Sequence, residues 1–184
     1  IVLPVEDEPF YSEKIIRMPF CYYAIDINKP ENPILTREDC GLPKNVFVYC
    51  CFCSHYKIEP EVFKLWAKIL KAVPKSVLWL FGDLEHIRAN LREAAHEYGI
   101  DPERLVFAER KSKMEHLSRH FHADICLDTL ICGGHTTTVD ALKMGIPVIT
   151  LPGNTLMTRV PKALLKTLQM PELIVDGKKG YVDQ

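Results

Sequence analysis

The sequence predicts an α/β fold, a Rossmann-like, doubly wound parallel sheet with helices on its faces. From residue 46 onward, short apolar runs alternate with amphipathic stretches, the order expected for parallel strands joined by helices. Pro60, Pro74, Gly99 and Gly145 separate these stretches at points where helices usually start or stop. Five or six strand and helix units fit into about 130 residues, as in one doubly wound domain.

The first predicted strand is the apolar run at residues 46–52, and the first predicted helix covers residues 60–73. Pro60 suits the first turn of this helix, and Pro74 ends it. The apolar side chains of the helix recur at helical spacing and so share one face. They are Val62, Phe63, Trp66, Ile69, Leu70 and Val73.

The same alternation continues toward the C-terminus. Residues 76–81 and 104–108 are predicted strands, and residues 84–98 form a predicted helix between them. A short helix is predicted at residues 113–121. The remaining predicted elements are strands at residues 123–128 and 147–151, helices at residues 136–144 and 160–168, and a short extended segment at residues 173–175.

The first 45 residues differ in character from the rest. They have no clear helical period and are rich in turn residues between positions 28 and 43. They hold six of the thirteen prolines, namely Pro4, Pro9, Pro19, Pro30, Pro33 and Pro43. We expect residues 1–45 to be a connector or the tail of a preceding domain, and residues 46–184 to be the Rossmann-like domain. Residues 9–19 could form a short helix.

Charge and hydropathy exclude several classes of partner. Lys and Arg total 23 against 24 Asp and Glu, a net charge of −1, whereas nucleic-acid binders usually have a basic excess. No apolar run approaches the roughly 20 residues that span a bilayer. We therefore expect neither a nucleic acid nor a membrane as a partner, and a cytoplasmic location, extending to the nucleus if the source is eukaryotic.

Seven cysteines lie mostly inside apolar segments, and their odd number argues against a disulfide framework. Cys50, Cys51 and Cys53 continue the first predicted strand, where successive side chains point to opposite faces. Core packing explains them better than a metal site does. Because no second Cys or Cys/His pair follows at zinc spacing, we expect no metal ion and no cofactor.

The sharpest candidate site is the run Gly-Gly-His-Thr-Thr-Thr at residues 133–138, after the fourth predicted strand. Gly134 lets a ligand approach the backbone, and Thr136 and Thr137 begin a helix whose free amides attract anions. The run therefore predicts a phosphate site. The alternative is a helix cap and a turn, because the spacing matches neither the Walker nor the dinucleotide motif. Asp128, just before the run, is expected to anchor amides of a neighbouring loop.

Other polar residues follow neighbouring strands and are expected at the same edge of the sheet. Lys57 could neutralise a diphosphate leaving group, or it could be a solvated lysine. Lys113, His116 and Arg119 are spaced along one helical face, which could contact a ribose and a base or could simply face water. Asp140 could accept hydrogen bonds from ribose hydroxyls, or it could pair inside its helix.

Several ordered motifs are similar to those of the protein O-linked N-acetylglucosamine transferases, the tetratricopeptide-linked family 41 glycosyltransferases that also include the SPINDLY-type fucosyltransferases. The motifs are Tyr56-Lys-Ile, Ser76-Val-Leu-Trp-Leu, Glu115-His116, Ala123-Asp-Ile-Cys-Leu-Asp-Thr, Gly134-His-Thr-Thr and Gly145-Ile-Pro-Val-Ile-Thr-Leu-Pro-Gly. The resemblance runs over residues 11–175. It implies the C-terminal, donor-binding half of a two-domain glycosyltransferase of the GT-B type.

The family resemblance also implies an activity. It implies transfer of N-acetylglucosamine from UDP-N-acetylglucosamine to Ser or Thr hydroxyls of intracellular proteins, with inversion and without a metal ion. The alternatives are a GDP-fucose-dependent SPINDLY-type transferase and a non-catalytic nucleotide-binding module. Because GT-B sites lie between two halves, the chain alone is expected to be inactive, and protein acceptors would be presented by preceding parts of a longer parent.

Residue roles follow from the same resemblance. Lys57 falls where the family has its catalytic, diphosphate-supporting lysine, and His135 falls where a histidine lies against the donor sugar and diphosphate. The run that begins at Gly134 would bind phosphate through Thr136 and Thr137. The nucleoside-binding strip and the ribose ligand would be Lys113, His116, Arg119 and Asp140.

Overall fold

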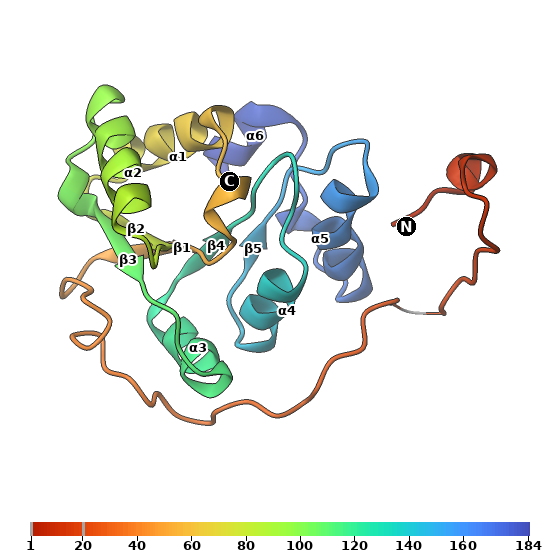
Figure 1. Ribbon diagram of the computed structural model, residues 1–184, viewed down its shortest axis with the longest axis horizontal. Helices are drawn as coiled ribbons and strands as arrows, with labels where there is room; N and C mark the ends of the chain where they lie inside the picture. The colour runs from red at the N-terminus through yellow and green to blue at the C-terminus, as the bar shows by residue number, and fades with distance from the viewer. Residues whose placement is uncertain (1, 20) are drawn as a thin grey trace.

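The computed structural model describes residues 2–19 and 21–184, and its centre is a five-stranded parallel sheet (Figure 1). The strand order is β3-β2-β1-β4-β5, and all four pairs of neighbours are parallel. The strands are β1 (Phe47–Cys51), β2 (Ser76–Phe81), β3 (Leu105–Ala108), β4 (Ile125–Leu127) and β5 (Val148–Ile149). All five predicted strands are present, and the predicted fold class is confirmed.

Helices cover both faces of the sheet. Figure 1 shows α1, α2 and α6 on one face and α3 and α4 on the other, with α5 beside α4. The helices are α1 (Pro60–Ala72), α2 (Glu85–Glu97), α3 (Lys113–Arg119), α4 (Thr136–Lys143), α5 (Leu156–Thr167) and α6 (Gly177–Asp183). Short 3-10 helices lie at Val5–Phe10, His55–Lys57, Pro102–Arg104, His120–His122 and Pro171–Leu173.

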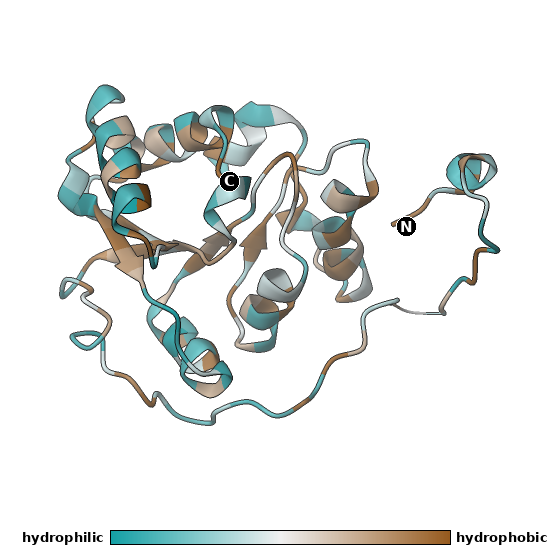
Figure 2. Cartoon of the chain, in the orientation of Figure 1, coloured by the Kyte–Doolittle hydropathy of each residue, from teal (hydrophilic) through white to brown (hydrophobic). Residues whose placement is uncertain are grey.

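The alternation of side chains along each strand builds two separate cores. In β2, Leu78 and Leu80 pack with α1, whereas Val77 and Trp79 pack with α3 and α4. Both sets are buried, and this explains why the strands are continuous apolar runs rather than alternating ones. Figure 2 shows the same pattern, with apolar strands enclosed by helices of mixed hydropathy.

The predicted helix at residues 160–168 is wrong at its start, because α5 begins at Leu156. Thr155 and Thr158 form a reciprocal capping box that starts the helix four residues earlier. Pro161 therefore lies inside α5 rather than near its first turn. A proline inside a helix is unusual, because it removes one helical hydrogen bond.

Three further differences concern the two ends of the chain. Of the predicted extended segment at residues 173–175, Ile174 alone forms a bridge, to Thr150, and Pro171–Leu173 is a 3-10 helix. The helix α6 was not predicted, since its sequence contains two glycines. Within residues 9–19, helical structure stops at Phe10 and belongs to the 3-10 helix Val5–Phe10.

The described residues before β1 contribute neither a strand nor an α-helix. They run along the side of the domain formed by α3 and α4 (Figure 1). Their assignment to a connector or a preceding domain stays a prediction. Within residues 2–19 and 21–184, no helix combines the length and apolar content that crossing a membrane requires.

Candidate functional site

The candidate site lies where the connections of the sheet change direction. β1 is bonded to β2 on one side and to β4 on the other, so the loops after β1 and β4 emerge side by side. In doubly wound sheets this switch point is the usual ligand site. Lys57, from the loop after β1, donates through Nζ to the carbonyl oxygen of Gly133 at 3.0 Å, so the two predicted loops meet.

The loop at residues 128–135, here called the glycine loop, leads into α4. His135 is the N-cap of α4, and no side chain of the described residues caps this helix. The first amides of a helix have no partner within it, so the N–H groups of Thr136 and Thr137 are open to a ligand. This arrangement fits an anion because the helix dipole adds partial positive charge.

Gly134 shapes the glycine loop rather than offering its own amide. Its N–H donates to Oδ1 of Asp128 at 2.7 Å, and its carbonyl accepts from Oγ1 of Thr138 at 2.9 Å. A Cβ atom at Gly134 would lie 2.4 Å from Oγ1 of Thr138 and 2.8 Å from Oγ1 of Thr137. The predicted anchoring role of Asp128 is confirmed by this hydrogen bond.

A second clamp on the glycine loop comes from α5. Pro161 has no N–H, which leaves the carbonyl of Met157 without its usual helical partner. Gly133 donates its N–H to that carbonyl at 3.2 Å, and a Cβ atom on Gly133 would lie 2.9 Å from Cγ of Pro161. The proline inside α5 thus creates the acceptor that holds the loop.

Charge at this part of the site is set by Lys57. Burial opposes its ammonium form, but the neighbouring thiols of Cys53 and Cys132 outweigh that effect and raise the pKa of Lys57. His135 is half-buried, and burial lowers its pKa, so the imidazole is neutral near pH 7. Nε2 of His135 has no partner among the residues described. The ring of His135 is bonded to the backbone of Met157, so in the neutral form Nε2 is an unpaired acceptor. The site therefore offers one fixed positive charge, that of Lys57, beside the open amides of α4.

The hydroxyls of the two threonines already have protein partners. Oγ1 of Thr136 lies 2.5 Å from the hydroxyl of Tyr23, and Oγ1 of Thr137 lies 3.2 Å from Sγ of Cys53. Both partners were missed by the sequence reasoning. Tyr23 comes from the segment before β1, where no periodic signal pointed to the site. Cys53 was attributed to core packing, and it is indeed buried.

The predicted nucleoside residues on α3 and α4 meet at Asp140. Nζ of Lys113 lies 2.6 Å from Oδ1 and 2.7 Å from Oδ2 of Asp140, and Nε2 of His116 lies 3.4 Å from Oδ2. Burial raises the pKa of Asp140, but the bonds from His116 and Lys113 outweigh it and lower the pKa overall. The structure thus brings these three side chains together, with Lys113 and His116 both bonded to the carboxylate of Asp140.

Arg119, predicted to lie on the nucleoside-binding strip, does not take the alternative water-facing position, because only 2% of it is exposed. Its Nη2 donates to the carbonyl of Glu109 at 3.0 Å, and its guanidinium lies 5.4 Å from the ring centre of Phe52. Nη1 has no partner in the described part of the chain. Arg119 is therefore held by these two contacts, and its Nη1 group keeps its N–H donors unused.

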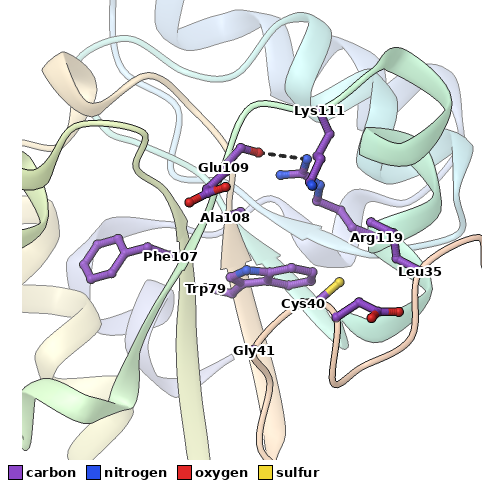
Figure 3. A pocket seen from close by; sticks show the side chains of 10 residues that line it. Leu35, Cys40, Gly41, Trp79, Phe107, Ala108, Glu109, Lys111 and Arg119 are labelled. Carbon is purple, nitrogen blue, oxygen red and sulfur yellow. Dashed lines mark hydrogen bonds between the residues drawn. The ribbon is translucent and has the colours of Figure 1, made fainter.

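Two cavities meet at Arg119. The first, about 370 Å³, is lined by Phe52, Lys113 and His116. The second, about 290 Å³, lies between Arg119 and Trp79 and is also lined by Cys40 of the segment before β1 (Figure 3). The sequence reasoning missed Phe52, whose ring lies 5.6 Å from that of His116. Its place at the carboxyl end of the first predicted strand, residues 46–52, was the signal that could have found it.

In the described part of the chain, no three His, Cys, Asp or Glu side chains gather in a way that could hold a metal ion.

Known proteins are similar to this chain over nearly its whole length. The family model for glycosyl transferase family 41 matches residues 23–184. The probable UDP-N-acetylglucosamine–peptide N-acetylglucosaminyltransferase SEC of Arabidopsis thaliana is 38% identical over 190 residues, which cover 100% of this chain and 19% of that protein. The UDP-N-acetylglucosamine–peptide N-acetylglucosaminyltransferase of Caenorhabditis elegans is 41% identical over 154 residues, covering 83% of this chain and 13% of that protein. The chain thus spans less than a fifth of these relatives.

Solved structures agree with the sequence matches. An O-GlcNAc transferase mutant of Thermobaculum terrenum superposes with a TM-score of 0.85 and 30% identity, over 99% of this chain and 34% of that chain. The C-terminal domain of a group 1 glycosyl transferase from Francisella tularensis has a TM-score of 0.52 at 14% identity, over 87% of this chain and 95% of that one, a likeness of fold alone. The sheet is that of a GT-B glycosyltransferase domain, and by its matched residues the chain belongs to glycosyl transferase family 41.

Proposed function

We propose that this chain is the donor-binding domain of an inverting protein O-N-acetylglucosaminyltransferase that uses UDP-N-acetylglucosamine. The observation that carries the proposal is that the ammonium of Lys57 bonds to Gly133, in the loop that leads directly into the open helix-start amides of Thr136 and Thr137 at the switch point of the sheet. An ammonium beside unpaired amides suits a diphosphate. The printed names of the A. thaliana and C. elegans relatives contain this donor and a peptide acceptor.

In the proposed reaction, a Ser or Thr hydroxyl of the acceptor attacks the anomeric carbon of the sugar. The bond from that carbon to the β-phosphate oxygen breaks, its electron pair stays on UDP, and the hydroxyl proton leaves to a base outside this chain. Negative charge grows on the leaving phosphate in the transition state. Lys57 and the amides of α4 stabilise that charge, and their contribution is larger in the transition state than in the ground state.

The nucleoside is proposed to bind on α3 and α4. Asp140 would accept hydrogen bonds from the ribose hydroxyls, with Lys113 beside it. His116, Arg119 and the ring of Phe52 line the adjoining cavity, whose size and aromatic walls suit a base. The unused Nη1 of Arg119 is a donor for a carbonyl oxygen of that base.

Calorimetric titration of the chain with UDP and with GDP tests the choice of nucleotide. We expect UDP to bind more tightly. A SPINDLY relative from Solanum lycopersicum is 29% identical over 177 residues, so a GDP-fucose donor is the competing proposal. Tighter binding of GDP would replace the UDP proposal with that one.

The role of Lys57 is tested by Lys57→Met. Loss of a charge-assisted contact of about 1.5–3 kcal/mol should weaken UDP binding roughly ten- to hundredfold. Lys68→Met, at an exposed position of α1, is the matched control and should bind UDP like the wild type. In a full-length parent, Lys57→Met should abolish transfer. Undiminished transfer would contradict the diphosphate role of Lys57, whereas absence of transfer by the wild-type parent would favour a non-catalytic nucleotide-binding module.

The chain alone is proposed to bind donor without transferring it. In a GT-B enzyme the acceptor side of the cleft belongs to the other half, and here the acceptor proteins would be presented by preceding parts of a longer, cytoplasmic parent. A radiolabelled transfer assay on the chain and on a full-length parent tests this. Transfer by the chain alone would overturn the proposal.

A further inference from the structure

A buried chain of hydrogen bonds joins α1 and α6 to the end of β4. Nε1 of Trp66 donates to the hydroxyl of Tyr181 at 3.1 Å, and that hydroxyl donates to the backbone carbonyl of Asp128 at 2.6 Å. Trp66, Tyr181 and Asp128 are 0%, 2% and 3% exposed. The helix α6, invisible to the sequence analysis, thus touches the first residue of the glycine loop.

The carboxylate of Asp128 holds two further segments. Oδ1 accepts the N–H of Gly134 at 2.7 Å, and Oδ2 accepts the hydroxyl of Thr150, just after β5, at 2.7 Å. A Cβ atom on Gly133 would lie 3.1 Å from Oδ2, so the loop passes directly over this carboxylate. One buried residue therefore connects α6, the residue after β5 and the glycine loop.

From these contacts we infer that Asp128 and Tyr181 are positioning residues of the donor site. They hold the glycine loop so that the Gly133 carbonyl meets Lys57 and the first amides of α4 point at the diphosphate. This inference rests on the proposed function. Neither side chain is a ligand itself: Tyr181 is 2% exposed, and both carboxylate oxygens of Asp128 are already used inside the protein.

The charge of Asp128 makes the positioning role testable. Burial raises the pKa of Asp128 to about 6, although the hydrogen bonds from Gly134 and Thr150 act to lower it. The titratable groups that face it are Lys57 and the thiol of Cys53 from the loop after β1, the thiol of Cys51 at the end of β1, and the hydroxyl of Tyr181 on α6. Protonation below pH 6 lets Oδ2 donate to the rotatable hydroxyl of Thr150 and leaves Oδ1 as an uncharged, weaker acceptor for the N–H of Gly134.

UDP-N-acetylglucosamine is the probe, because its diphosphate has no group that titrates near pH 6, unlike the terminal phosphate of UDP. Its affinity for wild type should fall as the pH is lowered from 7.5 through 6. In Asp128→Asn the amide oxygen still accepts from Gly134 but cannot titrate. We expect this variant to bind roughly fivefold more weakly at pH 7.5 and to lose the part of the pH dependence centred near 6.

Tyr181→Phe removes the hydroxyl alone and keeps the ring in the core. We expect roughly fivefold weaker binding of UDP-N-acetylglucosamine, the effect of one hydrogen bond. Tyr98→Phe is the matched control, because the ring of Tyr98 packs against Phe63. This variant should bind UDP-N-acetylglucosamine like the wild type. Thermal unfolding of each variant checks that the chain is folded at the temperature of the titration.

The outcomes separate the two proposals. Absence of binding by wild type would refute the proposed function itself. A second outcome is that wild type binds UDP-N-acetylglucosamine and that both Tyr181→Phe and Asp128→Asn bind it equally well, with the same pH profile as wild type. This outcome would overturn the positioning role and leave the proposed function standing. If Tyr181→Phe does not fold, the pH profile of Asp128→Asn decides alone.

Discussion

The two parts of the proposed donor site are built in different ways. The diphosphate part, Lys57 with the glycine loop and the start of α4, offers backbone amides and one ammonium, and buried residues behind it hold the loop. The nucleoside part consists of side chains that pair with one another, as Lys113 and Asp140 do. A ligand therefore meets open donors in the first part and must replace an internal ion pair in the second.

The buried titratable groups behind the two parts also differ. Asp128 supports the diphosphate part, and burial raises its pKa to about 6. His120 lies behind the nucleoside part, with its ring 5.1 Å from those of Phe52 and His116, and burial lowers its pKa to about 4. Each group is kept toward its neutral form, because charge is costly in the interior. Their effects on stability have opposite signs.

The largest expected effect is on the pH dependence of stability. Between pH 4 and 6, folded Asp128 binds more protons than it does unfolded, so its contribution to stability falls as the pH rises. Between pH 4 and 6.5, unfolded His120 binds more protons than it does folded, so its contribution rises with pH. Each contribution is about 3 kcal/mol at most, and in wild type the two largely cancel.

Asp128→Asn breaks this balance. The free energy of unfolding of the variant, relative to wild type, should increase by up to about 3 kcal/mol between pH 4 and 6.5. Urea denaturation of both proteins at a series of pH values measures this difference. The contributions of all other titrating groups are the same in both proteins and cancel in it. A difference that stays constant with pH would show that Asp128 does not titrate in this window.

The next effect separates the two parts by ligand. Asp140→Asn removes the charge that pairs with Lys113 and is proposed to hold the ribose. We expect UDP to bind about ten- to hundredfold more weakly, the loss of about 1.5–3 kcal/mol. Binding of inorganic diphosphate, which lacks a ribose, should not change. Calorimetry with both ligands tests this, and equal losses for both would show that the parts are not independent.

A smaller effect concerns the close packing of the glycine loop. Gly134→Ala places a methyl group against the hydroxyls of Thr137 and Thr138 and should cost about 1–3 kcal/mol of stability. In Gly180→Ala, the matched control on α6, the new Cβ atom would meet only Val175, at 3.5 Å, so the change should stabilise by about 0.5–1 kcal/mol. Chemical denaturation of both variants gives the comparison. Equal effects would mean that the loop has room to adjust.

The sequence predicted an element well wherever the hydrophobic period and the residues that mark element boundaries indicated the same limits. The strand at Ser76–Phe81 has the predicted bounds, and α4 ends one residue before the predicted end. The predicted start of α5 was four residues too late, and Pro161, inside this helix, has no N–H and so frees a carbonyl for Gly133. α6 escaped notice because seven residues with two glycines carry little helical signal.

The residues themselves determined the parallel α/β sheet, the glycine loop before a helix and the polar groups after neighbouring strands, because period, chain direction and loop position are local properties. The tertiary structure alone decided that Arg119 is buried, that Lys113 pairs with Asp140 and that Tyr181 reaches Asp128. These contacts join residues from different elements of the chain. Their partners are set by how the helices pack on the sheet, which no local pattern specifies.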